Sequence, residues 1–214
     1  MNGERLQELV YAGYAKAAAH TGRVYSHYRA ATPISPLEAG NLLGEIDCLF
    51  AAEKKFEVPQ KYKIPTRYLY ADGRELAQRD ILVGPYGTFF VGDMQPNLPM
   101  QAIWCNDSIA INRPIYEVGT TIEIVDGELI AYAVPCFRQL KKVDQKPVNS
   151  AYGASSAATP ISELFVYAPI DWTLLKQNDI VTDQTGRRFT LSNIDPTEIG
   201  AVLVCRQADT EGEG

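Results

Sequence analysis

Few residues in this chain could carry out acid–base or nucleophilic chemistry near neutral pH. It has two histidines, His20 and His27, and histidine is the side chain that exchanges protons most readily in that range. His20 closes a strongly helical segment, where a partly positive ring suits the helix dipole. His27 lies in a predicted strand between Ser26 and Tyr28. Neither belongs to a nucleophile–base motif, and the sequence contains no Walker-type phosphate loop and no HExxH motif. We therefore predict no catalytic residue and no enzymatic activity.

The carboxylates of the predicted turns are single residues rather than pairs: Asp72, Asp93, Asp107, Asp126, Asp183 and Asp195. Aspartate is common in turns because its side chain accepts hydrogen bonds from nearby backbone N–H groups. Asp93 and Asp107 could still come together in the fold and bind a cation. We favour the turn interpretation and predict neither a metal nor a cofactor.

The four cysteines are Cys48, Cys105, Cys136 and Cys205. None of them forms a CxxC pair, so the spacing does not indicate a zinc site. We interpret them as small buried apolar residues on strands. A disulfide within or between repeats, formed in an oxidising exterior, is the alternative.

Aromatic residues give a stronger signal than titratable ones, since the chain has twelve tyrosines. Tyrosine and arginine are enriched where proteins contact each other. The candidate contact residues are Tyr25, Tyr28, Tyr86, Phe89, Arg187 and Arg188. Carbohydrate stacking is the other use of exposed aromatics, and the presence of only two tryptophans, Trp104 and Trp172, gives it less support.

These residues lie on a sequence that repeats itself. The stretch Asp80–Cys105 resembles Asp179–Cys205, and such self-similarity indicates tandem units. Without a gap, Asp80 matches Asp179, Gly87 matches Gly186 and Phe90 matches Phe189; after a one-residue insertion, Cys105 matches Cys205. Upstream, Gly22–Tyr25 matches Arg113–Tyr116, Ile46–Cys48 matches Val134–Cys136, and Leu69-Tyr70 matches Val166-Tyr167. Lys-Lys pairs and prolines follow both upstream cysteines, at Lys54-Lys55 with Pro59 and at Lys141-Lys142 with Pro147.

Hydrophobic periodicity predicts one helix, at residues 4–20. Its apolar stripe comprises Leu6, Leu9, Val10, Tyr14, Ala17 and Ala18. Thr21-Gly22 would end the helix. We expect this stripe to pack on the first β unit or on a neighbouring subunit.

From residue 22 onward the sequence predicts strands separated by glycine and proline turns. Pro85-Tyr86-Gly87 and Asp126-Gly127 are hairpin signals. The fold class we predict is mainly β, with the N-terminal helix (1–21) followed by two related small β-barrels or β-sandwiches, at 22–112 and 113–207. We predict that residues 149–159 form a mobile loop and that residues 208–214 form a disordered acidic tail.

The composition of the chain limits the classes of partner that it could bind. The 214 residues are 46% hydrophobic and carry a formal net charge of −6, which argues against a nucleic-acid-binding protein with a basic face. It remains compatible with a wall that surrounds DNA without gripping it. No apolar run approaches the roughly 20 residues of a membrane span, and the N-terminus has no hydrophobic signal core. We expect folding in a cytosol and no membrane partner.

One segment resembles a known group of proteins. It contains Leu82–Pro85, Gly87–Phe90, Gln95–Pro99, Cys105-Asn106 and Arg113-Pro114. This pattern resembles proteins encoded among the structural genes of tailed bacteriophages. The later hairpin, residues 178–191, is similar to hairpins in the small β-barrels of head-closure and head–tail connector proteins. The chain differs from single-barrel connectors in its apparent second copy.

The resemblance implies a structural virion component, assembled in the host cytoplasm. The expected role is a head–tail connector, neck or collar protein that forms a homo-oligomeric ring between the portal and the tail. Its partners would be itself, the portal and adjacent neck or tail proteins, with genomic DNA passing nearby without specific binding. A tail or baseplate protein and a host-surface glycan-binding module are the alternatives.

Overall fold

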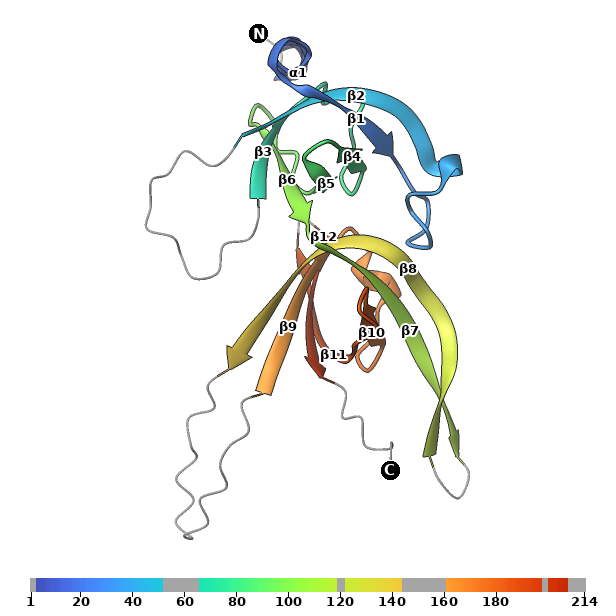
Figure 1. Ribbon diagram of the computed structural model, residues 1–214. Helices are drawn as coiled ribbons and strands as arrows, with labels where there is room; N and C mark the ends of the chain where they lie inside the picture. Colours follow the sequence, from blue (N-terminus) through green and yellow to red (C-terminus); the bar gives the residue numbers. More distant parts are fainter. Residues whose placement is uncertain (1–2, 52–65, 119–121, 144–160, 198–199, 208–214) are drawn as a thin grey trace, which may run out of the picture.

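The chain begins with one helix and continues as two closed β-barrels placed one after the other (Figure 1). The structure, a computed structural model, describes residues 3–51, 66–118, 122–143, 161–197 and 200–207. The predicted mobile loop 149–159, the acidic tail 208–214, the Lys54-Lys55 pair, Pro59 and Pro147 lie outside the described residues.

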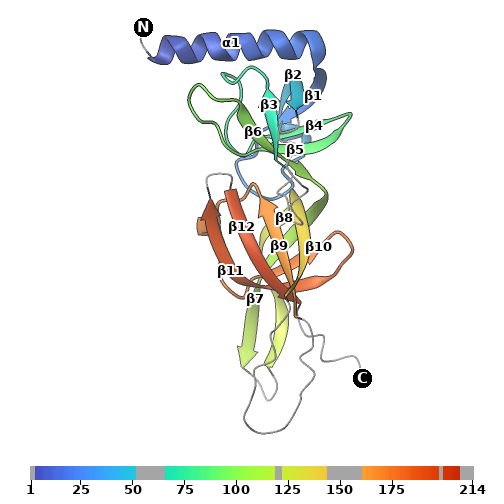
Figure 2. The ribbon, with the colours of Figure 1, turned by 90° about the vertical axis from the view of Figure 1, so that its left-hand side faces the viewer.

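Helix α1 (Gly3–Thr21) lies across the outer end of the first barrel (Figure 2). Ala18 is buried, and the Tyr14 ring meets Tyr70 edge-on, with ring centroids 5.1 Å apart. Leu6 and Leu9 face solvent, with 42% and 58% of their surface exposed. These leucines and Ala17 of the predicted stripe therefore do not pack on the first barrel, because the helix contacts the barrel along a narrower line of positions.

The end of the helix is set by Gly22. A Cβ at this position would lie 2.5 Å from the Ala18 carbonyl oxygen and 2.6 Å from that of Cys48. Only glycine allows the chain to turn this closely from the helix into the first strand. The Thr21-Gly22 stop signal is confirmed.

The first barrel comprises β1 (Arg23–Tyr28), β2 (Leu42–Ala51), β3 (Thr66–Tyr70), β4 (Ile81–Gly84), β5 (Gly87–Val91) and β6 (Met100–Cys105). The second comprises β7 (Asp107–Val118), β8 (Ile122–Val143), β9 (Ile161–Ala168), β10 (Ile180–Asp183), β11 (Arg188–Thr197) and β12 (Gly200–Gln207). Short 3-10 helices, η1 (Ala39–Asn41) and η2 (Trp172–Leu174), lie in the connections. Around the barrels the strand orders are β1-β2-β3-β6-β5-β4 and β7-β8-β9-β12-β11-β10. The two orders are identical when each strand number in the first is raised by six, so the mainly β fold with two related units is confirmed.

Strand registers show which residues correspond between the barrels. Cys48 pairs with the first residue of β1, and Cys136 with the first residue of β7, so the predicted match of these cysteines holds. Phe89 pairs with Leu82, and Phe189 with Val181, so Phe189 corresponds to Phe89 rather than to Phe90. One extra residue of the second unit therefore lies in the β10–β11 turn, before Phe189.

Two further predicted matches are corrected by the registers. Cys205 pairs with Leu191 and corresponds to Ala102, which pairs with Val91, so Cys105 has no cysteine counterpart there. Arg113 follows Asn112, the partner of Ile180, just as Arg29 follows Tyr28, the partner of Ile81. Arg113 therefore corresponds to Arg29 and does not open the second unit.

The boundary between the units lies at Asn106, six residues before the predicted one. Residues Asp107–Asn112 pair with β8 and β10 of the second barrel. Arg113-Pro114 suggested a break, but the proline lies inside β7 at a register irregularity between Arg113 and Ile115. At Pro114, β7 no longer pairs with β10. The proline, which has no backbone N–H, therefore removes no hydrogen bond on the edge of β7 that faces β10.

Each barrel has its own apolar core. The first is built around Tyr25, Leu69, Phe89 and Met100, and the second around Ile111, Phe189 and Leu203. A third cluster joins the barrels: Ile81, Phe90, Ile103 and Cys105 of the first pack with Phe137 and Tyr167 of the second. Full burial of such side chains stabilises by roughly 1.5–3 kcal/mol each, so the apolar contact between the barrels is substantial.

Candidate functional site

The most deeply buried charge of the first barrel is Asp80, which is 1% exposed. Arg29 donates to both carboxylate oxygens, Nε to Oδ1 at 2.8 Å and Nη2 to Oδ2 at 2.7 Å. His27 Nε2 and the Ala77 N–H each lie 2.7 Å from Oδ2. Burial by itself raises the pKa of Asp80, but the hydrogen bonds from Arg29, His27 and Ala77 outweigh it, so the net pKa is lowered. The group is a fixed carboxylate and unsuited to proton transfer near pH 7.

The second barrel contains the same clamp around Asp179, also 1% exposed. Arg113 donates to its two oxygens at 3.1 Å each, and the Lys176 N–H donates at 2.8 Å. In both barrels the arginine Nη2 also reaches a carbonyl oxygen, of Glu75 at 2.9 Å and of Leu174 at 2.8 Å. Repetition of the bidentate aspartate–arginine clamp in two barrels points to a structural role.

The two clamps differ at His27. His27 pairs with Leu82, and Val181, the equivalent of Leu82 in the second barrel, pairs with Ile111. The counterpart of His27 is therefore Ile111, which is fully buried. An apolar residue therefore occupies the equivalent position in the second barrel. His27 is 4% exposed and bonded to Asp80, so it lies in the barrel wall and not in a cleft.

A second polar cluster fills one mouth of the second barrel. Arg138 lies between the buried carboxylates of Asp107 and Asp183. Thr185 donates to Asp183 from its N–H at 2.9 Å and its hydroxyl at 2.6 Å, and Arg187 from its N–H at 3.0 Å and Nε at 2.9 Å. Burial raises the pKa of Asp183, and the donors from Thr185 and Arg187 more than reverse that effect, so the net pKa is lowered.

The corresponding mouth of the first barrel is apolar. Phe50 in the first barrel is the counterpart of Arg138 in the second, because Phe50 pairs with Leu69 and Arg138 pairs with Val166, the equivalent of Leu69. The Phe50 ring stacks on Phe89, with ring centroids 4.0 Å apart. The two barrels thus close the same opening by different means, an aromatic stack and an ionic plug.

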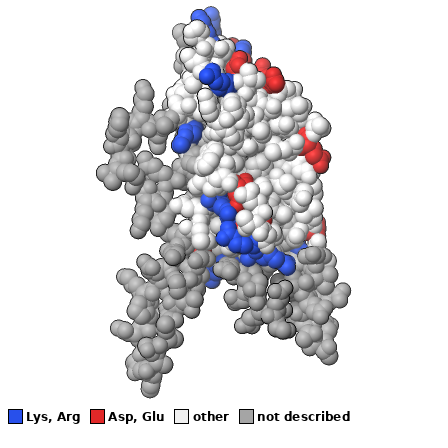
Figure 3. Space-filling view, viewed as in Figure 1, with Lys and Arg blue, Asp and Glu red and all other residues white. Residues whose placement is uncertain are grey.

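The six predicted contact residues fall into three groups. Tyr25 and Phe89 are 1% and 5% exposed and belong to the first core, so their prediction as contact residues is wrong. Tyr28 packs against the cluster between the barrels. Tyr86 is 65% exposed, and Arg187 and Arg188 are exposed as well. These three lie on or beside equivalent hairpin turns, β4–β5 and β10–β11, and Figure 3 shows Lys and Arg gathered over the second barrel.

The cysteines are free and buried, so the strand interpretation holds and none is in a disulfide. Burial raises the pKa of Cys48 to about 12 and that of Cys205 to about 12, and it raises those of Cys105 and Cys136 as well. The thiols are therefore protonated and unreactive near neutral pH. In the described part of the chain, no three His, Cys, Asp or Glu side chains are grouped so as to hold a metal ion.

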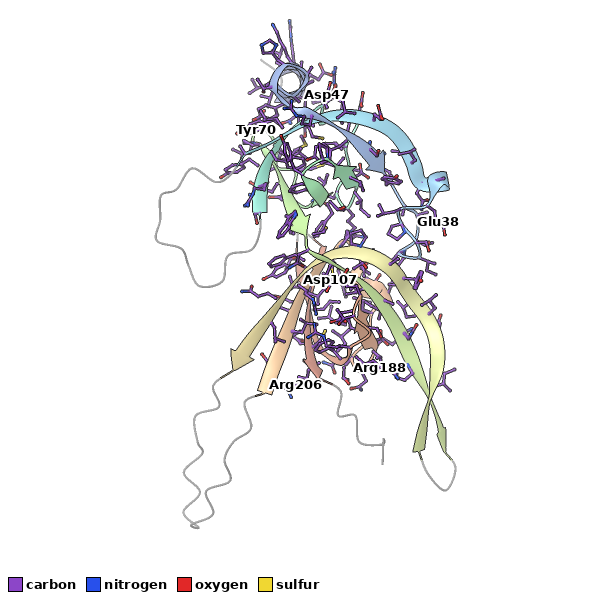
Figure 4. All side chains as sticks on the ribbon, viewed as in Figure 1. Glu38, Asp47, Tyr70, Asp107, Arg188 and Arg206 are labelled. Carbon is purple, nitrogen blue, oxygen red and sulfur yellow. The ribbon has the colours of Figure 1, made fainter. Side chains whose placement is uncertain are left out.

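Asp93 and Asp107 do not come together as a cation site. The Asp93 carbonyl accepts from the Gln101 N–H at the start of β6, and its side chain accepts from Gln95 at 2.7 Å. Asp107 lies past the other end of β6, at the junction of the barrels (Figure 4). Strand β6 therefore separates the two carboxylates.

A clasp between the barrels was not predicted. Asn106, the one residue between β6 and β7, donates to the Cys136 carbonyl at 3.0 Å and exchanges two side-chain bonds with the Arg138 backbone, at 3.0 and 2.8 Å. The β1–β2 connection forms a parallel bridge from Ile34 to Tyr132 on β8. Arg79 and Asp171 form an ion pair at 3.2 Å across the junction. The barrels are therefore fastened at three separate points.

A cleft of about 290 Å³ lies at this junction. Its lining includes Pro33, Pro36, Ile170 and the paired Arg79 and Asp171. The charged groups on its wall neutralise each other. The described residues that line the cleft present no converging set of donors or acceptors that would define a ligand.

Among the described helices, none has the length and apolar character needed to cross a membrane. In the comparisons with known proteins, no family model, no curated protein and no solved structure matches the chain.

Proposed function

We propose that the protein is a structural component of a tailed-phage virion, and specifically a head–tail connector or neck protein that assembles as a ring between portal and tail. The observation that carries this proposal is the tandem of two barrels of one topology, joined through a single residue and clasped together. Such a rigid pair suits a load-bearing wall. The phage-like segment Leu82–Pro99 forms β4, β5 and the loop toward β6.

The state of the buried groups supports a scaffold over an enzyme. Asp80 and Asp183 have lowered pKa values and saturated hydrogen bonding, and the buried thiols have raised pKa values. Catalysis would need a group able to change protonation near pH 7. On this proposal the protein's partners are other copies of itself, the portal and neighbouring neck or tail proteins, with DNA passing along a wall that does not bind it specifically.

A second candidate function, glycan binding at the host surface, has one observation in its favour. Tyr86 is 65% exposed and Trp104 39% exposed. A Cβ on the neighbouring Gly87 would lie 3.0 Å from Trp104 Nε1, so the indole lies against the hairpin that carries Tyr86. Exposed aromatic rings of this kind can stack on sugars. A tail or baseplate position is the alternative within the virion class.

Negative-stain images of the purified protein, with and without the portal, separate these functions. Rings, or caps on the portal, are the expected result. A protein that forms neither but binds glycans on an array, with binding lost in Tyr86→Ala, would support the second candidate. Tyr86→Ala is a suitable probe because the side chain is exposed and outside the core.

A further inference from the structure

One side of helix α1 is apolar and exposed. Leu6 and Leu9 are 42% and 58% exposed, and a Cβ on Gly13 would meet open space. At 3.6 residues per turn, positions 6, 9 and 13 share one side of the helix. Tyr14 and Ala18, which meet the first barrel, lie on a different side. The exposed side, here called the helix face (Leu6, Leu9 and Gly13), is free to bind another surface.

Basic residues border the helix face. Arg5 lies four residues before Leu9 and Lys16 lies seven residues after it, so all three share a side of the helix. Both basic side chains are exposed. The acidic residues Glu4 and Glu8 instead line a hollow between α1 and the β5–β6 loop. The helix face therefore combines apolar and positive character.

A second exposed apolar surface follows the β1–β2 connection. It is here called the leucine patch, and its side chains are 38–57% exposed: Ile34, Leu37, Leu42, Leu43, Leu129 and Tyr132. The bridge from Ile34 to Tyr132 joins the parts of the patch that belong to the two barrels. Leu42 and Leu43 are adjacent and both exposed because the β1–β2 register is irregular at this point. Figure 1 shows the connection, the start of β2 and β8 along one side of the molecule. Exposed apolar patches of this kind mark interaction sites.

Acidic residues border the leucine patch. Glu38 on the connection and Glu45 on β2 are exposed, and Figure 4 shows Glu38 at the outer edge of the molecule. Glu128, beside the patch on β8, is 69% exposed at its side chain. The nearby arginines, Arg29 and Arg113, are held by the buried aspartates of the two clamps. The leucine patch therefore combines apolar and negative character.

We propose that α1 of one copy docks through its helix face on the leucine patch of a second copy, with Arg5 and Lys16 against Glu38 and Glu45. An amphipathic helix commonly binds in this way, through apolar anchors three and four residues apart. Leu6 and Leu9 are the anchors here. This inference deepens the proposed assembly function and rests on it.

Charge selects this pairing over the two symmetric ones. Two helix faces packed on each other would bring the basic residues of both copies together, and two leucine patches would bring the acidic residues together. Like charges across an interface oppose association. Only the pairing of one helix face with one leucine patch joins opposite charges.

Such a contact is heterologous, so it propagates into a ring or a filament according to the rotation between copies. Figures 1 and 2 show α1 at the outer end of the first barrel, whereas the leucine patch crosses the junction of the barrels. One copy can therefore use both surfaces at once, as every subunit of a closed ring must.

Complementation between two defective variants tests the contact. Leu9→Asp damages only the helix face, and Leu43→Asp damages only the leucine patch. Each variant is measured alone and in a 1:1 mixture by native mass spectrometry, with one of the two carrying a heavy nitrogen isotope. Leu98→Asp, at an exposed leucine (51%) in the β5–β6 loop, is the matched control. Circular dichroism confirms that each variant is folded.

We expect the wild-type protein and Leu98→Asp to self-associate, and each of the other variants to associate at least roughly tenfold more weakly, because a charge replaces a buried anchor. Their mixture should form a dimer of one labelled and one unlabelled chain and nothing larger, since only one intact helix face and one intact leucine patch can meet. Added salt should weaken the wild-type contact several-fold, because opposite charges attract across it.

Association of either variant as strong as that of Leu98→Asp would overturn the contact. A loss in Leu9→Asp alone, without a mixed dimer, would overturn it in favour of a symmetric contact between two helices. If Leu9→Asp still forms rings or portal caps, the helix contact fails and the proposed function stands. A wild-type protein that neither self-associates nor binds the portal would contradict both.

Discussion

Asp80 and Asp179 occupy the same position in the two barrels, and each is clamped through both of its carboxylate oxygens by an arginine, Arg29 and Arg113 respectively. In each barrel the first strand pairs with the fourth strand. Each arginine immediately follows the last residue of the first strand that takes part in this pairing. Each aspartate immediately precedes that fourth strand. The clamp therefore fastens the strand pair that closes the barrel.

Removal of the charge from Asp80 should destabilise the fold. Asp80→Asn leaves Arg29 without its bidentate acceptor, and losing one partner of a buried pair costs about 3–5 kcal/mol. Since Arg29 is partly exposed, we expect the lower part of this range in urea unfolding. Asp47→Asn, at an exposed carboxylate on β2, is the control and should be nearly neutral. Equal effects of the two substitutions would contradict a structural clamp.

Acid should unfold the protein through the same carboxylates. Asp80 and Asp183 have folded-state pKa values below the ordinary 3.8. Their stabilisation is therefore present above the unfolded pKa and is lost as pH falls through the folded pKa. The free energy of unfolding should be flat near neutrality and should decline below about pH 4. The decline should be shallower in Asp183→Asn, and an unchanged slope in that variant would rule out this contribution.

Arg79 is held in a left-handed conformation, with φ of 72°, and its counterpart in the second barrel is Asn178, also with φ of 72°. Asparagine tolerates this region better than arginine does. The Arg79–Asp171 ion pair is exposed and is worth at most about 1 kcal/mol. Arg79→Asn should therefore leave the melting temperature unchanged or slightly raised. Arg79→Lys, which keeps the charge and the strain, is the comparison. A large loss in Arg79→Asn alone would show that the ion pair holds the barrels together.

The four thiols should not react with a labelling reagent while the protein is folded. Because burial raises the pKa values of Cys48, Cys105, Cys136 and Cys205, labelling with a thiol reagent at pH 7 should proceed only as the chain unfolds. Four labels should appear together in denaturant. Fast labelling of the native protein would show that at least one of these strands opens readily.

Phe89 and Tyr86 should behave oppositely, although both were predicted to make contacts. Phe89 is 5% exposed and stacks on Phe50, and Phe→Ala at such a site costs about 3–5 kcal/mol. Tyr86→Ala should change stability by less than about 0.5 kcal/mol. Thermal unfolding of both variants measures this contrast. Similar losses would place Tyr86 in the packed core as well.

The repeat could be predicted because its turns and caps use distinctive residues. Asp80 with Asp179 and Gly87 with Gly186 are required by the clamp and by positive φ angles in both turns. Phe90 was matched with Phe189 because Phe89 and Phe90 are adjacent and identical in type. Only pairing with Leu82 shows that Phe89 faces the core.

Other features depend on register and cannot be read from residue types. Arg138 meets Asp107 and Asp183 because three strands converge at one barrel mouth. The clasp at Tyr132 uses backbone atoms, which any sequence supplies. The boundary at Asn106 was missed because β6 continues into β7 without the glycine or proline that usually separates units.

The most direct test of the connector proposal is a count of copies in the complex with the portal. Native mass spectrometry of the purified protein, alone and mixed with the portal, measures this number. The proposed function predicts one defined oligomer that binds the portal as a closed ring. A protein that stays monomeric at every concentration and leaves the mass of the portal unchanged would contradict it.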